Sequence, residues 1–319
     1  MYAGAFDGCS KLTSIDLSHT NLSEIDDACF TNCSALTSVS FPSSLQTIGN
    51  EVFLNCPNLS SITWDAWDGK ATLGATSFDG IYQNQGTVVV TNPINPEHSS
   101  IKLLNTLIDS ASMPIDWGLA LPSTIYDIDS TNNVLYGFSE DFLQNISDYA
   151  DFRIMKIPAS VTMISSFAFY GNSTCKIPSY IKKLTFEEQS EITEIGSASF
   201  RGTTASPSPI KSVDLINCSS LEAISASGFE GCQWLSSIYL PSSLSSLWDG
   251  IFQNCRSLKL IVWDGISKNP TKINSDSFKN VNTNGIVKIT HSVQGYTSTD
   301  LLNFLKTNGG LPTGWTAEE

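Results

Sequence analysis

One short block of residues recurs along the chain and constrains the fold more than any other feature. In its fullest form the block places Phe53, Cys56, Leu59 and Ile62 at regular spacing. Copies also begin at Phe6, Phe30, Phe229 and Phe252, and degraded or looser copies surround Phe78, Phe142, Phe169 and Phe200. The steps between neighbouring copies are nearly equal, and they lie within the range of about 20 to 29 residues that is typical of leucine-rich repeats. The chain is therefore predicted to be a repeat array.

Each repeat is predicted to contain a short strand, a turn, a second apolar pair and a helical turn around the Phe. Period-two alternation places Ile15 and Leu17 inward and Ser14 and Asp16 outward. One coil cannot fold alone, because burying about six apolar side chains contributes at most ~1.5 to 3 kcal/mol each, whereas ordering about 23 residues costs ~1 to 2 kcal/mol apiece. Neighbouring coils must therefore stack into a repeat solenoid with one parallel β-sheet.

A longer duplication divides the chain into two arrays. Trp64 matches Trp263, Phe78 matches Phe278, and Trp117 matches Trp315, with nearly the same offset in each case. Residues 101–110 and 299–307 both have the pattern of an amphipathic helix that leads to a Pro-x-x-Trp ending. Such helices are expected to cap the C-terminal end of each array, where the core would otherwise meet water. We predict a first array at residues 1–119 and a second at 120–319, with an atypical first unit between Tyr126 and Phe186.

Three segments carry a family resemblance in addition to the recurring block. They are AFDGCSKLTSIDL at residues 5–17, IPASVTMI at 157–164 and LPSSLSSL at 240–247. With the block, they resemble the BspA-like leucine-rich repeat family. The resemblance implies a right-handed solenoid and secreted or surface-anchored proteins of host-associated anaerobic bacteria and some parasitic protists. For some members it also implies adhesion to host matrix proteins or to other microbes.

Charge and hydropathy restrict the partners. The chain has 31 acidic and 17 basic residues, a net charge of -14, and the sequence suggests no basic stripe, so nucleic acid and anionic membranes are poor partners. No run approaches the roughly 18 to 20 apolar residues of a membrane helix. Because the chain begins inside a repeat, at residues 2–6, we expect a signal or anchor, and earlier repeats, to precede it in an extracellular or cell-surface protein.

The eight cysteines suggest packing more than chemistry. Five of them occupy one repeat position, where stacked strands lie ~4.7 to 4.9 Å apart, whereas a disulfide requires Cβ atoms about 3.8 Å apart. A ladder of buried free thiols is therefore favoured over disulfides. Metal binding is disfavoured because no Cys-x-x-Cys pair exists and His19, His98 and His291 occupy unrelated positions.

No catalytic residue or cofactor is predicted. Nucleophilic catalysis requires a Ser or Cys, a His and a carboxylate that converge, and the sequence has no motif for such a site. Acidic pairs such as Asp26 with Asp27, Asp127 with Asp129, and Glu187 with Glu188 could serve in glycoside hydrolysis. A solvated loop surface explains them better.

The outward face of the sheet is the candidate binding surface. In the first array alternation places small polar side chains there, and in the second array larger ones: Ser14, Asp16, Ser38, Ser40, Ser61 and Thr63, then Ser212, Asp214, Ser237, Tyr239, Leu260 and Val262. These residues either keep an exposed sheet soluble or form an open strip for a protein or glycan.

Tryptophans that do not recur are further candidates. Trp67 and Trp248 have no counterparts and are expected at the surface, where aromatic residues often anchor partners. Filling of a local gap is an equal alternative. Trp64, Trp117, Trp263 and Trp315 recur in register and are assigned to the core or the caps.

Three functions are consistent with these patterns. The first is a non-enzymatic, exported protein that mediates adhesion to a protein or glycan on host or neighbouring cells. The second is a glycan-binding or glycan-processing accessory that uses Asp127, Asp129 and Asp141. The third is a structural spacer that holds another domain off the cell surface.

Overall fold

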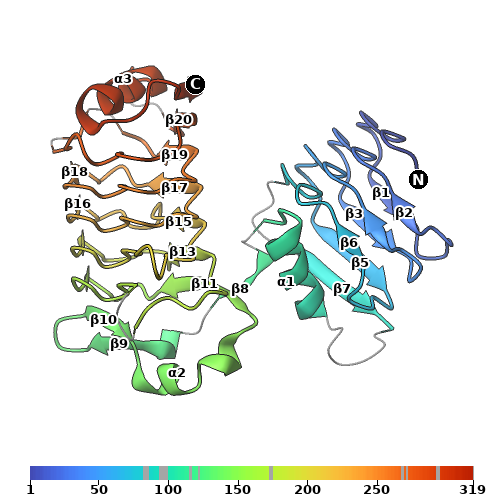
Figure 1. Ribbon diagram of the computed structural model, residues 1–319, viewed down its shortest axis with the longest axis horizontal. Coiled ribbons are helices and arrows are strands. Elements are labelled where there is room, and N and C mark those ends of the chain that lie inside the picture. Colours follow the sequence, from blue (N-terminus) through green and yellow to red (C-terminus); the bar gives the residue numbers. More distant parts are fainter. Residues whose placement is uncertain are drawn as a thin grey trace. The chain divides into compact units, whose positions relative to one another are not determined.

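The computed structural model describes residues 1–81, 86–92, 100–114, 117–120, 123–171, 175–266, 269–270, 272–291 and 295–318. The chain divides into two compact units, Met1–Leu119 and Ala120–Glu319. Each unit has its own hydrophobic core and consists of stacked coils (Figure 1).

The first unit contains two parallel sheets. The wider sheet has the order β1 (Ser14–Asp16), β3 (Ser38–Phe41), β5 (Ser61–Asp65) and β7 (Thr87–Thr91). The narrower sheet has the order β2 (Glu24–Ile25), β4 (Thr47–Ile48) and β6 (Thr72–Leu73). The parallel sheet predicted from the repeats is the wider one. The second apolar pair of each repeat forms the narrower one, which was not predicted.

The second unit repeats this design with more coils. Its wide sheet has the order β21 (Thr316–Glu318), β20 (Ile286–Ile289), β19 (Leu260–Trp263), β17 (Ser237–Leu240), β15 (Ser212–Asp214), β13 (Lys183–Phe186), β11 (Phe152–Ile157) and β8 (Leu119–Ala120). Its second sheet has the order β18 (Ser246–Leu247), β16 (Ala223–Ile224), β14 (Glu194–Ile195), β12 (Met163–Ile164), β10 (Val134–Phe138) and β9 (Tyr126–Asp129).

The atypical first unit predicted for the second array is a hairpin with short helices. Strands β9 and β10 pair antiparallel, and β10 then pairs parallel with β12. Helix α2 (Glu140–Gln144) and the 3-10 helices η3 (Ser123–Ile125) and η4 (Ile146–Tyr149) accompany the hairpin. Phe138 and Phe142 of this region are buried in the same core as the repeats that follow.

Stacked Phe rings run through the core of each unit. The ring centroids of neighbouring coils are 5.1, 5.5 and 5.1 Å apart along Phe6, Phe30, Phe53 and Phe78. They are 5.4, 5.2, 6.0 and 5.3 Å apart along Phe169, Phe200, Phe229, Phe252 and Phe278. These distances are close to the separation of hydrogen-bonded strands, about 4.7 to 4.9 Å, so each coil contributes one ring at the same depth.

Glycines in the narrow sheet allow the coils to approach closely. A Cβ atom on Gly74 would lie 2.4 Å from the carbonyl oxygen of Gly49, and one on Gly49 would lie 2.6 Å from the backbone nitrogen of Asp27. Both contacts are with backbone, which no change of rotamer relieves. The glycine that follows Ile48 or Leu73 is therefore required by the spacing of the coils.

The two C-terminal capping helices are confirmed. Helix α1 (Ser100–Ser110) closes the first unit and α3 (Ser298–Gly309) closes the second. The helices are followed by the buried indoles of Trp117 and Trp315. Each indole packs on a glycine, because a Cβ on Gly86 or Gly285 would lie 2.1 or 2.7 Å from the ring. The recurrence of these tryptophans is thus explained by packing.

The cysteine ladder is confirmed as free thiols. Cys33, Cys56, Cys232 and Cys255 each direct Sγ to the carbonyl oxygen of a Phe in the preceding coil, at 3.1 to 3.3 Å. Burial raises the pKa of Cys56 to about 12, so its thiol stays protonated at neutral pH.

Thiol titration tests this ladder. With Ellman's reagent at mildly alkaline pH, only the half-buried Cys9 and Cys175 are expected to react promptly in the native protein, because burial protects the other six and disfavours their thiolates. In denaturant without reductant, all eight should react. A shortfall of two or more thiols in denaturant would demonstrate disulfides and contradict the ladder.

Candidate functional site

The predicted residues of the first unit lie together on one sheet face. Ser14, Ser38 and Ser61 are register neighbours on β1, β3 and β5. Asp16, Ser40 and Thr63 form the adjacent row on the same strands. Ser14 and Asp16 are exposed and the other four are half-buried. The face is a strip of short hydroxyl side chains with one carboxylate at its edge.

Asp16 is engaged locally. Its carboxylate accepts hydrogen bonds from the backbone nitrogen of Ser18 at 2.9 Å and from Ser18 Oγ at 2.6 Å. These bonds lower the pKa of Asp16, so the group stays ionised at neutral pH. The strip therefore carries one fixed negative charge beside small neutral groups.

The corresponding face of the second unit is charged and apolar. Asp214 and Tyr239 are register neighbours on β15 and β17, and Asp214 forms an ion pair with the buried Lys183 at 3.5 Å. The prediction that Val262 is exposed is wrong, because only 2% of it is accessible. Its register neighbours are Tyr239 and Lys288, whose long side chains flank it on both sides.

The prediction that Trp67 is exposed is also wrong. Only 6% of Trp67 is accessible, and it belongs to the core of the first unit. Ala66 and Gly69 on either side have positive φ angles of 43° and 76°. This reversal of the chain carries the indole back into the core, so Trp67 fills a local gap.

Trp248 is exposed, as predicted, but its ring is covered on one face. It follows β18 and is 42% accessible. The Nζ atom of Lys272 lies 3.6 Å from the ring centroid, within the range of a cation–π interaction. The candidate residues from the sequence therefore do not form one site. They lie on the sheet faces of the two units, in the core at Trp67 and at a sheet edge at Trp248.

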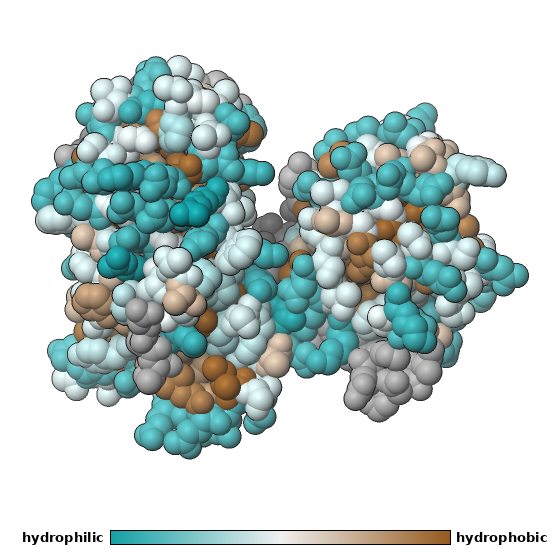
Figure 2. All heavy atoms as spheres, in the orientation of Figure 1, coloured by the Kyte–Doolittle hydropathy of each residue, from teal (hydrophilic) through white to brown (hydrophobic). Residues whose placement is uncertain are grey.

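A groove in the second unit contains a tryptophan that sequence reasoning did not select. Trp234 is 56% accessible and lies in a groove of about 660 Å³. Its apolar walls are formed by Ile146, Ile177, Pro178, Pro207 and Pro209. Pro207 and Pro209 come from the Ser- and Pro-rich stretch 203–209, which forms a loop, as predicted. The face of the molecule shown in Figure 2 is mainly hydrophilic or intermediate, with small hydrophobic patches.

One sequence signal does point to Trp234. It stands between Cys232 and Leu235 of the recurring block. The equivalent positions in other copies hold Lys11, Ala35, Asn58 and Ser257. A large aromatic residue at a position that is otherwise small or polar is a departure that the core does not require.

Lysines line the rim of this groove. Lys176, Lys182 and Lys211 lie along it, and no acidic residue lines it within the described part of the chain. The backbone nitrogen of Lys211 donates to the carbonyl of Lys182 at 2.6 Å, and the ladder continues through Ser236 to Lys259. These four residues occupy the same repeat position in successive coils, each directly before a wide-sheet strand.

This column, in which Ser236 separates Lys259 from Lys182 and Lys211, was not predicted from the sequence. Lys182, Lys211 and Lys259 are far apart in the sequence, so only the register brings them into one column. In the first unit the same position holds Thr13, Thr37 and Ser60. Of the 17 basic residues of the chain, fourteen belong to the second unit.

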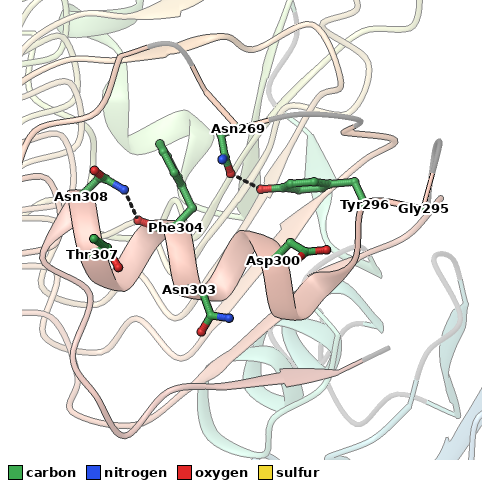
Figure 3. A pocket seen from close by; sticks show the side chains of 8 residues that line it. All are labelled: Asn269, Gly295, Tyr296, Asp300, Asn303, Phe304, Thr307 and Asn308. Carbon is green, nitrogen blue, oxygen red and sulfur yellow. Dashed lines mark hydrogen bonds between the residues drawn. The ribbon is translucent and has the colours of Figure 1, made fainter.

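A second concave site lies over the capping helix α3. This polar pocket, of about 560 Å³, is lined by Asn269, Gly295, Tyr296, Asp300, Asn303, Phe304, Thr307 and Asn308 (Figure 3). The Tyr296 hydroxyl donates to Asn269 Oδ1, and Asn308 Nδ2 donates to the Phe304 carbonyl at 3.0 Å. Asp300 is engaged in the N-terminal capping box of α3. In Figure 3, Phe304 and Asn303 leave the helix in opposite directions, so the side chains do not converge on one point.

The carboxylates considered for glycan processing support local structure. Asp129 accepts hydrogen bonds from the Thr131 backbone nitrogen at 2.8 Å and from Asn132 Nδ2 at 2.9 Å, and these bonds lower its pKa. Asp141 accepts from Asn145 Nδ2 at 3.1 Å at the end of α2. The lowered pKa makes Asp129 a poor general acid, and the Asp141 carboxylate is engaged in a local hydrogen bond. Within the described residues, no three His, Cys, Asp or Glu side chains are grouped so that they could bind a metal ion.

The fold is defined by stacked coils whose strands form parallel sheets and by a repeated Phe-x-x-Cys-x-x-Leu block, and it is a leucine-rich repeat solenoid. A sequence profile described as the BspA type leucine-rich repeat region matches residues 1–84 and 179–299 in six copies. These ranges include more than half of the chain, so the chain belongs to the BspA type leucine-rich repeat family. None of the helices in the described part of the chain is long and apolar enough to span a bilayer. No curated protein matches the sequence.

Several solved structures are similar to this chain. The T. pallidum leucine-rich repeat protein TpLRR has 16% identity over 62% of this chain and 86% of its own, with a TM-score of 0.38. The pneumococcal vaccine antigen PcpA has 16% identity over 93% and 71%, with a TM-score of 0.37. A leucine-rich cell surface protein from Faecalibacterium prausnitzii has 22% identity over 82% and 68%, with a TM-score of 0.27. The family assignment depends on the repeat match and not on these likenesses.

Proposed function

We propose that this protein is a non-enzymatic, exported surface protein that binds protein ligands and thereby mediates adhesion. The family resemblance supports the surface location and the adhesive role. The groove beside Trp234 is the main contact site. The sheet face of the first unit, with its short hydroxyl side chains, contributes a soluble surface and not the anchor.

The accessibility of Trp234 within a concave, apolar site is the observation that supports this proposal. A tryptophan in such a site gains contact area at little entropic cost, and tryptophan is enriched among the residues that dominate binding energy. The groove volume of about 660 Å³ lies within the range of about 300 to 1,000 Å³ in which ligand sites are usually found. The core does not require an indole here, and an exposed indole in a groove is suited to contact with a partner.

Adhesion is tested with the immobilised full chain and two matched tryptophan variants. The probes are a panel of purified extracellular-matrix proteins and intact co-resident cells at micromolar concentration. Trp234→Ala is expected to weaken binding about tenfold or more, because it removes the anchor, whereas Trp248→Ala should stay within about twofold. Surface plasmon resonance measures both. Failure of every probe, or equal binding by the two variants, would contradict the proposal.

Glycan binding is the second candidate, and the pocket over α3 favours it. Amide groups of Asn269 and Asn303 can donate to and accept from sugar hydroxyls, and the rings of Tyr296 and Phe304 offer apolar faces. A glycan array probed with the full chain and with Phe304→Ala separates the two functions. Glycan binding that depends on Phe304 and not on Trp234 would place the function in the cap.

A further inference from the structure

We propose that the groove beside Trp234 binds an extended, acidic peptide segment that carries an apolar side chain. This inference rests on the proposed binding of a protein ligand and adds the chemistry of the segment that is recognised. Three properties of the groove support this proposal independently: its charge, its hydrogen-bond donors and acceptors, and the shape of its walls.

Charge favours an anionic ligand. The rim carries Lys176, Lys182 and Lys211 in a chain whose net charge is -14. Lys176 and Lys211 are exposed and form no ion pair within the described part of the chain, while Lys182 Nζ donates to the Ser179 carbonyl. A cationic rim on an acidic protein attracts acidic segments and repels basic ones. It therefore raises the association rate of acidic ligands and the specificity for them.

The polar groups of the groove disfavour a neutral glycan. Sugar hydroxyls need acceptors as well as donors, and such sites usually offer carboxylate or amide side chains. Here the polar side chains are three ammonium groups, which only donate, and the hydroxyls of Ser179 and Ser206. Carboxylates are the natural partners of such a set of donors.

The walls favour an extended segment with one apolar side chain. Trp234 lines the groove together with proline and isoleucine side chains, which are apolar. Pro178, Pro207 and Pro209 have no backbone N–H to donate. Pairing with a β-strand is therefore disfavoured, because the prolines cannot donate to it. Contacts between side chains remain, as in grooves that bind extended, proline-rich segments.

The column of lysines sets the direction of the ligand. Lys182 and Lys211 belong to adjacent coils, about 4.8 Å apart along the stack. An acidic segment that runs along the stack would meet both ammonium groups while its apolar side chain reaches Trp234. Lys259 occupies the same repeat position two coils beyond Lys211 but does not line the groove. It therefore offers a matched control.

Selection from a random peptide library tests the proposal without a guess at the ligand. Phage-displayed peptides of about twelve residues are selected on the full chain and depleted on Trp234→Ala. We expect the enriched peptides to carry net negative charge and at least one aromatic or branched aliphatic residue. Their affinity, measured by fluorescence anisotropy, should fall about tenfold or more in Lys176→Glu/Lys211→Glu and stay within about twofold in Lys259→Glu. It should also fall as salt is raised.

Folding and ligand class are controlled separately. The circular dichroism spectrum and urea midpoint of each variant should match those of the parent, because the replaced side chains are exposed. Three results would overturn the inference. The enriched peptides could be neutral or basic, or no peptide could be enriched on the parent over Trp234→Ala. The third is equal peptide affinity in Lys259→Glu and Lys176→Glu/Lys211→Glu. The inference would also be overturned by a polyuronate that binds through Trp234 when no peptide does. If matrix proteins still bind through Trp234 in any of these cases, the proposed function stands and only the ligand chemistry fails.

Discussion

Replacing Phe53 by alanine is expected to lower the free energy of unfolding of the first unit by about 3 to 5 kcal/mol. The ring is fully buried and stacks between Phe30 and Phe78, with centroids 5.5 and 5.1 Å away. The variant would leave a cavity in the middle of the ring column, and the fixed spacing of the coils prevents its collapse. Urea denaturation followed by far-UV circular dichroism measures the loss.

Tyr2→Ala is the matched control for Phe53→Ala. Tyr2 belongs to the same unit, is aromatic and is almost completely exposed. Its replacement should change stability by no more than about 0.5 kcal/mol. Similar effects of the two substitutions would show that the repeat register is wrong, because Phe53 would then be no more buried than Tyr2.

Replacing Trp315 by alanine should cost about 3 to 5 kcal/mol and detach the C-terminal cap. The indole is 1% accessible, packs on Gly285 and donates from Nε1 to the Asn282 carbonyl at 2.8 Å. The Nζ of Lys306 on α3 in turn donates to the Trp315 carbonyl at 2.7 Å. Loss of the indole therefore removes its packing on Gly285 and its bond to Asn282, and so weakens the attachment of α3 and β21 to the last coil, although the Lys306 bond to the backbone carbonyl is kept.

Hydrogen exchange followed by mass spectrometry locates this effect. Because coils contact only their neighbours, α3, β20 and β21 should lose protection first, and β11, which lies farther along the same sheet, should be affected much less. Trp248→Ala serves as the control, since Trp248 is exposed in the same unit. Unchanged protection of α3 in Trp315→Ala would contradict the capping role.

The fold could be predicted from the sequence wherever a residue recurs. The block around Phe53 and the nearly constant offset between the two arrays identify the coils, the core and both caps, because recurrence in register is imposed by stacking. The narrow sheet was missed because its strands have two residues each, too few to show alternation. The prediction for Trp67 was wrong because this residue has no counterpart in other repeats, so the repeat pattern does not indicate whether it is buried. The chain reversal at Ala66 places its side chain in the core.

The candidate site could not be predicted in the same way. The groove combines Ile146 and Trp234 with side chains from residues 176–182 and 205–211, segments that only the coil stacking brings together. The lysines of the column align although each lies in a different coil, separated from the next by at least one complete repeat. Only Trp234 gives a signal in the sequence, through its size at a position where other copies have Lys11, Ala35 or Asn58.

The central claim is that the recurring residues build the solenoid, whereas Trp234, which does not recur, contacts the ligand. It is tested most directly by measuring urea stability and ligand binding together in Trp234→Ala. We predict an unfolding free energy within about 0.5 kcal/mol of the parent and binding weakened about tenfold or more. A loss of several kcal/mol with unchanged binding by the remaining folded protein would contradict the claim, because it would make Trp234 another residue of the core.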